Sequence, residues 1–443
     1  MYRRRFTPAG LLAVAAALAL TVTACGGSNT AQEAPASEAG AGSAAASAPA
    51  PAESAPAGVS GVVEVWTWNN EGDYVKVDEA AVERFKAANP EAEVKITYIP
   101  YADYVTKLKA AIAAGNPPDV AQIPWAGEFR DIVESGKLLP LDDILANGFP
   151  EFSAPAMNAV TLQGQKWALP LDLNTLQIAY NKTLFESLGL KPPTSAEELK
   201  ALAAKLDAEG KFGISVGDKD QWVGGDLWFA QLPYTDPTGG ALANADAGEV
   251  PWTDPAFVAA GDVVADYQKS GVFAPGANAM TSFVEALDLF VGQQAGMFYP
   301  VGNFISGGIA EKVGDAFEWE LMPFPPLEAG GTPVATGGIA RMFTIPSDAK
   351  NQAGAIAFLQ ALTDAEGQAT LLQYNFIPAW SVDIPADASP LFANFLEAQG
   401  DAASRVIYTS PVYTALLNGM QGILDGSETG AGVAESMQAA ADG

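Results

Sequence analysis

Tryptophan side chains lie beside amide and carboxylate side chains at several points of the chain, which has nine Trp. Aromatic rings stack on flat C–H faces, and carboxylate, amide and arginine groups form paired hydrogen bonds with hydroxyls, so such residues together could hold a sugar. The candidates are Trp68, Asn69, Glu71, Trp125, Asp172, Asn174, Trp222, Asp226, Trp228 and Arg341, with Gly337 and Gly338 allowing close backbone approach. Each side chain also has an ordinary structural explanation, since a tryptophan can pack in the core and Arg341 can pair with a carboxylate.

The elements that would position the first of these candidates alternate between strand and helix. The spacing of apolar residues predicts strands over 62–68, 92–99 and 120–123 and helices over 73–88 and 101–114. This order is typical of a parallel α/β sheet, in which ligands bind at the carboxyl ends of the strands. Trp68, Asn69, Glu71 and Trp125 are therefore expected on loops that face a crevice.

The stretch 165–190 combines a polar-dotted extended segment with a capped helix. It contains the β-favouring run 178–180, and Asn181 is a natural N-cap for the helix that follows. Gly189 is placed to end that helix, and Pro192 prevents its continuation. The stretch fits either a crossover between two lobes or an ordinary buried strand and helix.

The rest of the chain continues as a mixture of helices and short strands. We expect irregular structure over residues 218–234, which are rich in aromatic residues and contain the run Gly224-Gly225-Asp226. We expect helices over 196–209, 255–270, 281–291, 351–362 and 364–372, a strand over 212–216, and a mainly helical section from 390 to 442.

Charge and composition exclude several classes of function. The 443 residues include 23 Lys and Arg against 52 Asp and Glu, which gives a net charge of −29 and should repel nucleic acid. The chain has no His, so His-based metal sites and Ser-His-Asp triads are excluded, and we expect no cofactor. Its one Cys, Cys25, excludes a disulfide within the chain.

The N-terminus accounts for that cysteine. Three arginines precede the apolar run 11–22, which is too short for a confident membrane span. The sequence up to Cys25 resembles a bacterial lipobox, which implies a signal peptide over 1–24 and a lipid on the Cys25 thiol; the alternative is a secretory signal with a stray cysteine. Residues 25–60 are rich in Ala, Pro and Ser and are expected to form a disordered tether that holds the folded part at the membrane.

A longer motif connects the chain to a known family. From 164 to 199 it carries Gly164, Trp167, Leu169, Pro170, Tyr180, Asn181, Lys182, Leu184, Phe185, Gly189, Leu190, Pro192, Pro193, Thr194, Glu198 and Leu199. This pattern resembles the central signature of extracellular solute-binding proteins of the maltose-binding type, the capture subunits of ATP-driven (ABC) sugar importers. The runs 115–120 and 337–346 resemble further segments of the same family.

The resemblance implies an α/β protein with the two-lobed periplasmic-binding-protein fold (type II), in which each lobe is a mostly parallel sheet flanked by helices and the ligand binds in the cleft between them. It implies an N-terminal lobe of 60–174 plus 326–380 and a C-terminal lobe of 175–325 plus 381–443. Phe304 and Tyr413 match family positions where an aromatic ring stacks on sugar, although the family usually has Trp at the first. The implied protein is an extracytoplasmic monomer that closes around a carbohydrate and delivers it to an ABC permease, without catalysis.

Three other functions fit parts of the sequence. A cleft of acidic and aromatic residues would also hold a polyamine or another cation. A secreted glycoside hydrolase would need two carboxylates about 5–9 Å apart, for which Asp172 and Asp226 are the available pair. A surface receptor that passes a signal to a partner would use the same fold.

Overall fold

The computed structural model describes residues 59–69, 72–125, 127–236, 238–383, 388–400, 402–407 and 409–443. All of them belong to one of the two units into which the chain divides, 55–443. Cys25, the expected signal peptide, nearly all of the tether and Glu71 lie outside the described residues. Among the described residues, no helix has the length and apolar character needed to cross a membrane.

The strands follow one another as β1 (Gly61–Thr67), β2 (Ala92–Tyr98), β3 (Val120–Gln122), β4 (Thr161–Leu162), β5 (Gln165–Lys166), β6 (Leu169–Asn181), β7 (Phe212–Ser215), β8 (Ala295–Val301), β9 (Trp319–Met322), β10 (Thr336–Thr344), β11 (Ile377–Pro378) and β12 (Ala403–Ser404). Apart from the β4–β5 pair they form one sheet, with the order β2-β1-β3-β10-β6-β8-β7 along its main path. The pairs at its two ends are parallel, and the long strands β10 and β6 run antiparallel at its centre.

The α-helices are α1 (Asp73–Ala88), α2 (Tyr101–Ala113), α3 (Gly127–Glu134), α4 (Asp142–Leu145), α5 (Ala154–Ala159), α6 (Lys182–Ser187), α7 (Ala196–Ala208), α8 (Val223–Phe229), α9 (Leu232–Thr235), α10 (Ala241–Asp246), α11 (Pro255–Lys269), α12 (Leu287–Val291), α13 (Asn303–Val313), α14 (Gln352–Thr363), α15 (Ala365–Gln373), α16 (Pro390–Gly400), α17 (Ser410–Asp425) and α18 (Gly430–Asp442). A 3₁₀ turn, η1 (Ala277–Ala279), and a π-helical turn, η2 (Ser282–Ala286), precede α12.

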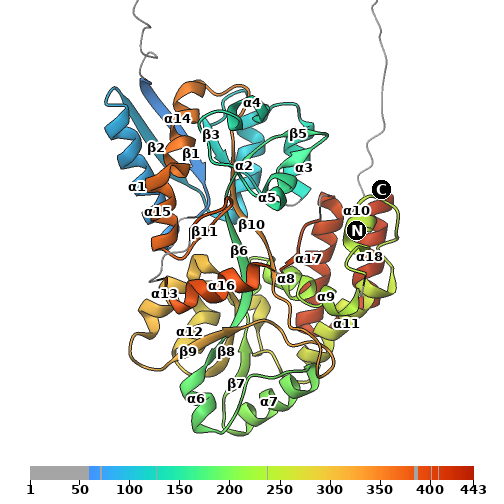
Figure 1. The fold of residues 1–443 in the computed structure, drawn as a ribbon. Helices are drawn as coiled ribbons and strands as arrows, with labels where there is room; N and C mark the ends of the chain where they lie inside the picture. The colour runs from blue at the N-terminus through green and yellow to red at the C-terminus, as the bar shows by residue number, and fades with distance from the viewer. Residues whose placement is uncertain are drawn as a thin grey trace, which may run out of the picture. The chain divides into compact units, whose positions relative to one another are not determined.

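The central stretch has the local structure that its sequence predicts. β6 is 13 residues long and buried almost throughout, and Figure 1 shows it running down the middle of the fold. Asn181 caps α6 by accepting a hydrogen bond from the Leu184 N–H at 2.8 Å, and the chain turns away at Gly189, whose φ is 64°. The β6 residues pair with β10 on one part of the strand and with β8 and β9 further along.

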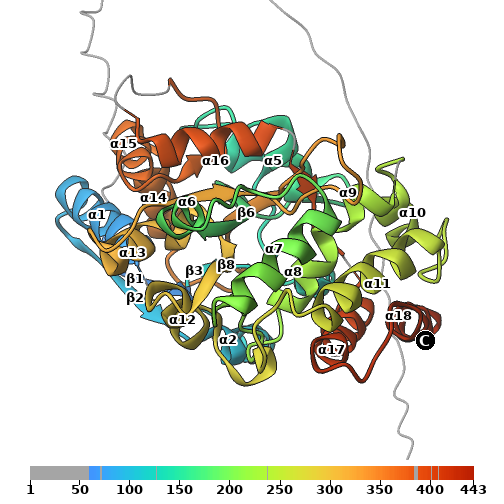
Figure 2. The same cartoon turned by 90° about the horizontal axis from the view of Figure 1, so that it is seen from below.

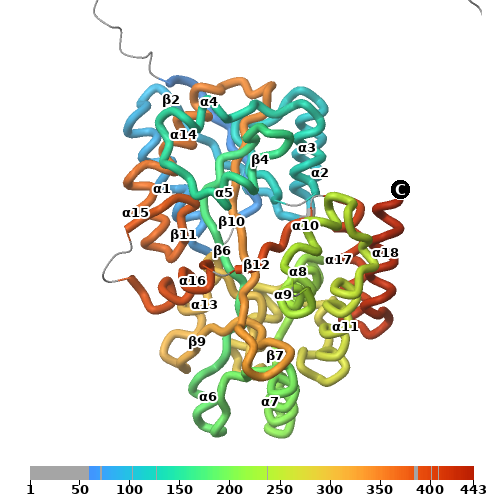
Figure 3. The backbone as a smooth tube through the Cα atoms, turned by 45° about the vertical axis from the view of Figure 1, so that its right-hand side comes forward, coloured from blue at the N-terminus to red at the C-terminus, as the bar shows by residue number. Residues whose placement is uncertain are grey.

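Three hydrophobic clusters surround the sheet. One draws its members from residues 63–171 and 339–380, and a second from 176–324 and 407–437. The third, smaller cluster packs α12 and α13 against β8 and α16 against β6. In the second cluster α11, α17 and α18 pack against one another beside the sheet (Figure 3).

The segment 218–234 differs from the irregular structure that we expected. It contains α8 and α9, and α8 packs against α11 and α17 (Figure 2). All residues of α8 are buried, and a Cβ on Gly224 would lie 3.0 Å from the Met420 Cβ of α17. Glycine lowers intrinsic helix propensity, but it also lets α8 approach α17 closely, and this tertiary packing accompanies the helix that the sequence did not predict.

Candidate ligand-binding site

The aromatic residues expected at strand ends meet around one cavity. Trp68 directly follows β1 and Trp125 follows β3, so the two rings come from the carboxyl ends of neighbouring parallel strands. The cavity has a volume of about 360 Å³, within the range of small-molecule sites. Its walls are Trp68, Asn69, Tyr74, Pro100, Tyr101, Pro124, Trp125, Asn174, Asp220, Trp222, Phe283, Phe304, Ile305, Ala340, Arg405 and Tyr413.

Seven of the sequence candidates line this cavity: Trp68, Asn69, Trp125, Asn174, Trp222, Phe304 and Tyr413. They arrive from β1, β3, β6, α8, α13 and α17 or from the loops beside them, which are far apart in the chain. Tyr413 lies edge-on to Trp125, with ring centroids 6.3 Å apart. The structure thus brings into one place residues that were chosen separately from the sequence.

The aromatic lining is ordered by ring-to-ring contacts. Phe283, on the π-helical turn η2, lies 5.8 Å from Trp222 and edge-on to Phe304 at 5.5 Å, centroid to centroid. Tyr74 is nearly parallel to Phe304, at 6.2 Å and an interplanar angle of 7°. Because rings in such contacts have little freedom to rotate, the cavity presents preformed flat surfaces to a ligand.

Gly337 and Gly338 lie elsewhere. They line a second cavity of about 310 Å³, and Trp125 and Arg405 stand in the walls of both cavities. A Cβ on Gly337 would lie 2.8 Å from the Asn174 carbonyl oxygen, and Gly338 has a φ of 152°. The close backbone approach that we expected at this pair is therefore made to β6 and the 402–404 segment.

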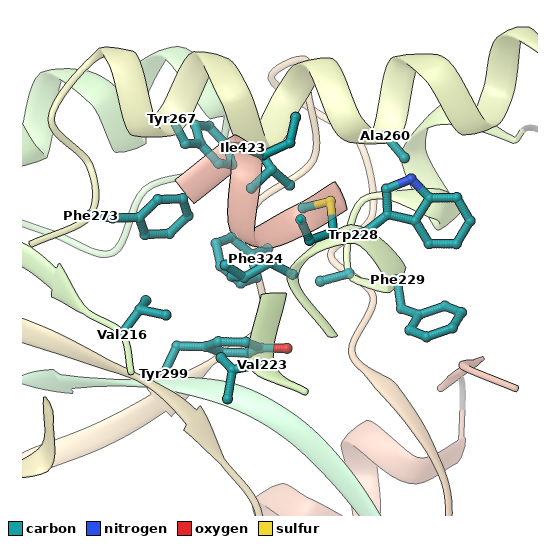
Figure 4. Close-up of a cluster of buried hydrophobic side chains, with 14 of the residues drawn as sticks. Val216, Val223, Trp228, Phe229, Ala260, Tyr267, Phe273, Tyr299, Phe324 and Ile423 are labelled. Atoms are coloured by element: carbon teal, nitrogen blue, oxygen red, sulfur yellow. The ribbon is translucent and has the colours of Figure 1, made fainter. Parts of the chain in front are cut away.

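Trp228 does not reach either cavity. Its side chain is fully buried in the core among α8, α11 and α17, as Figure 4 shows, and its indole N–H donates to the Phe257 carbonyl oxygen at 3.1 Å. Trp228 and Trp222 are six positions apart on one segment, but Trp222 stands at the N-terminal end of α8 beside the cavity and Trp228 points into the core. The expectation of a ligand contact at Trp228 is corrected, because its indole N–H is already bonded and its ring has no exposed surface for a ligand to contact.

Arg341 and Asp172 form part of a buried charge cluster beneath the cavity. The Arg341 Nε lies 3.2 Å from Asp172 Oδ1, its Nη1 lies 3.0 Å from Asp78 Oδ1, and both arginine and Asp172 have no exposed surface. Neither lines the cavity, and of the two roles considered for Arg341 the structure shows the pairing with carboxylates. The Arg341 Cζ lies 4.1 Å from the centroid of Tyr74, so the cluster supports a ring that does line the cavity.

Burial dominates the electrostatics of this cluster. It raises the pKa of both Asp78 and Asp172 to about 6, and the Arg341 charge opposes that rise. Burial also raises the pKa of Tyr74 well above its ordinary value. The phenol of Tyr74 is therefore neutral at any physiological pH.

Asp226 lies directly behind the cavity wall. Both of its carboxylate oxygens accept from Arg405 Nη1, at 3.1 and 3.3 Å, and Arg405 Nη2 donates to Asn174 Oδ1 at 3.0 Å. Burial raises the pKa of Asp226, and the Arg405 charge opposes this. Since Asp172 and Asp226 each bond an arginine and neither lines the cavity, the structure offers no support for the hydrolase pair.

Sequence reasoning missed several residues of the lining. Tyr101 follows a predicted strand at Pro100, so the same strand-end rule could have found it. Phe283 lies inside a predicted helix, and Arg405 lies in the C-terminal section, where no motif marked it. Only the tertiary structure brings these two to the cavity.

The family is shown by a comparison over most of the chain. The sequence model of the family of bacterial extracellular solute-binding proteins matches residues 31–369. The chain belongs to this family. The expectations of a solute-binding protein and of an α/β fold with a central sheet flanked by helices are confirmed, and membership of an extracellular family implies a location outside the cytoplasm. Family members are binding proteins rather than enzymes.

Individual relatives of this solute-binding protein have low sequence identity to it, but the similarity covers most of the chain. The alpha-glucosides-binding periplasmic protein AglE of Rhizobium meliloti is 25% identical over 336 residues, 71% of this chain and 72% of that protein. The osmoprotective compounds-binding protein GgtB of Synechocystis is 25% identical over 296 residues, 63% and 69% of the two chains. The solved GacH receptor of Streptomyces glaucescens matches with a TM-score of 0.73 and 23% identity, covering 86% of this chain and 98% of that one.

Proposed function

We propose that this solute-binding protein captures a carbohydrate in the 360 Å³ cavity and delivers it to the permease of an ABC importer. The observation that carries the proposal is the lining itself: eight aromatic rings with two asparagines and one arginine among them. Rings suit the C–H faces of a sugar, and amide and guanidinium groups suit its hydroxyls. The names of AglE and of the GacH receptor, solved with acarbose, are consistent with this ligand class.

The proposed ligand contacts come from the candidates that line the cavity together with Tyr74, Tyr101, Phe283 and Arg405. We propose two lobes, 60–174 plus 326–380 and 175–325 plus 381–443, which close around the ligand because only the closed form makes both sets of contacts. The two large hydrophobic clusters support this division, since the buried members of one lie in the first proposed lobe and those of the other lie in the second.

Attachment to the membrane is part of the proposal. A lipid on Cys25 would hold the folded part near its permease at the cell surface, and the residues up to 60 would serve as the tether. The protein would act as a monomer and without catalysis, since a capture subunit needs only binding and closure.

A thermal-shift screen of the purified protein against oligosaccharides, polyamines and amino acids tests the ligand class. A ligand at a hundred times its dissociation constant adds about 2.7 kcal/mol to the free energy of unfolding, which shifts the melting temperature visibly. Stabilisation by oligosaccharides supports the proposal. Stabilisation by polyamines alone would replace the proposed ligand with a cation, for which Asp220 is the carboxylate in the cavity wall.

Trp222 allows a direct test of the cavity. Its ring lines the cavity and contacts Phe283 there, so Trp222→Ala should weaken binding of the sugar found in the screen by at least about tenfold, or 1.4 kcal/mol. Trp319→Ala is the matched control, because Trp319 lies in β9 and lines neither cavity. Equal affinities for the two variants by isothermal titration would show that the ligand binds elsewhere.

A further inference from the structure

Arg405 is the charged donor in the wall of the cavity. Among the described residues that line the two cavities it is the only Lys or Arg, and it stands in the wall of both. Its guanidinium Cζ lies 4.5 Å from the centroid of the Trp125 ring. The side chain is 5% exposed and its partner Asp226 is 3% exposed, so water screens this pair very little.

The positive charge of Arg405 is balanced by the Asp226 carboxylate, which lies behind the cavity wall. Nη1 is bonded to both oxygens of Asp226 and Nη2 to the amide oxygen of Asn174, while Nε is buried without a partner in the described structure. A ligand therefore meets a donor whose charge is balanced. A hydroxyl or ring oxygen can accept from such a donor, whereas a ligand carboxylate would compete with Asp226 and leave one of two buried anions unpaired.

We infer that the Arg405–Asp226 pair makes the cavity select uncharged sugars over acidic ones, with Asp226 as the residue that enforces the exclusion. The inference rests on the proposed sugar binding and adds the charge class of the ligand. It also predicts a reversal: an uncharged residue at 226 leaves the guanidinium of Arg405 uncompensated and ready to take a carboxylate. Arg–carboxylate pairing is strong and bidentate, so the gain should be large.

The test measures neutral and acidic probes on the same protein by isothermal titration at neutral pH. The matched probes are galactobiose and digalacturonic acid, in which carboxylates replace the C6 hydroxymethyl groups of the neutral sugar. Wild type should prefer the neutral member of the pair, and Asp226→Asn should bind the acidic member at least tenfold more tightly than wild type does. Asp220→Asn, which removes an exposed carboxylate from the cavity rim, is the control and should give a much smaller gain.

Two further variants keep the inference falsifiable if Asp226→Asn fails to fold. Asp226→Ser removes the same charge with a smaller side chain. Asn174→Asp adds a carboxylate beside Arg405 Nη2 without changing size, and it should shift preference toward amino sugars such as chitosan disaccharide.

The outcomes separate this inference from the proposed function. Neutral sugar binding with no gain for acidic probes in the 226 variants, or an equal gain in Asp220→Asn, would overturn the inference alone. A wild type that binds acidic probes as tightly as neutral ones would do the same. A wild type that binds neither kind of sugar would overturn the proposed function as well.

Discussion

Arg341→Met should reveal how much of the fold depends on the buried charge cluster. The substitution removes the only positive charge that contacts Asp78 and Asp172 in the described structure, and it leaves those carboxyls 3% and 0% exposed. Methionine keeps most of the side-chain length, so the change is mainly electrostatic. Removing one partner of a buried ion pair costs about 3–5 kcal/mol, because the remaining charge cannot regain water.

The loss should depend on pH, and its direction follows from the carboxyl groups. In the wild type the pKa of both Asp78 and Asp172 is raised to about 6, so the stability they contribute is present at low pH and is lost as pH rises toward 6. Without Arg341, which holds those pKa values down, they rise further. Above pH 6 the variant should then lose about 1.4 kcal/mol more per pH unit than the wild type for each carboxyl that stays protonated.

Urea unfolding at pH 6 and pH 8 measures both effects. The variant should lose about 3–5 kcal/mol at pH 8 and distinctly less at pH 6. Adding Asp78→Asn and Asp172→Asn to Arg341→Met should abolish the extra pH dependence, since the cluster then contains no carboxyl. Lys137→Met, which breaks an exposed pair with Asp348, is the control and should change stability by less than about 1 kcal/mol. A loss below 1 kcal/mol in Arg341→Met, with an unchanged pH slope, would refute this reasoning.

Two other changes test separate parts of the molecule. Burial raises the pKa of Asp218 to about 7, so the wild type should lose stability as pH rises from about 4 to 7. Asp218→Asn should reduce this loss, measured as the difference in the free energy of unfolding in urea between pH 5 and pH 8. An equal difference in the wild type and the variant would contradict the raised pKa of Asp218. Cys25→Ser should release the protein from the membrane fraction into the medium in metabolically labelled cells, and a variant retained in the membrane would contradict the lipid anchor.

Local signals in the sequence predicted many elements correctly because those elements depend on short-range physics. The strand at 92–98 follows from period-two alternation, and α6 follows from the Asn181 cap. The strand-end rule also led to Trp68 and Trp125, because the ends of neighbouring parallel strands must meet at one edge of a sheet.

The sequence by itself determined the alternation of strands and helices, the family, and a set of aromatic and polar residues suited to a ligand. Only the tertiary structure decided which of them meet. Trp222 stands at the N-terminal end of α8 and lines the cavity beside Phe283, whereas Trp228 lies near the other end of α8 and packs on Phe257 in the core. Of the two arginines that are buried among the described residues, Arg341 lies beneath the cavity and Arg405 lies in its wall, where it bonds Asn174 across 231 positions of sequence. Contacts over such separations depend on how whole helices and strands pack, and no local pattern of residues encodes that arrangement.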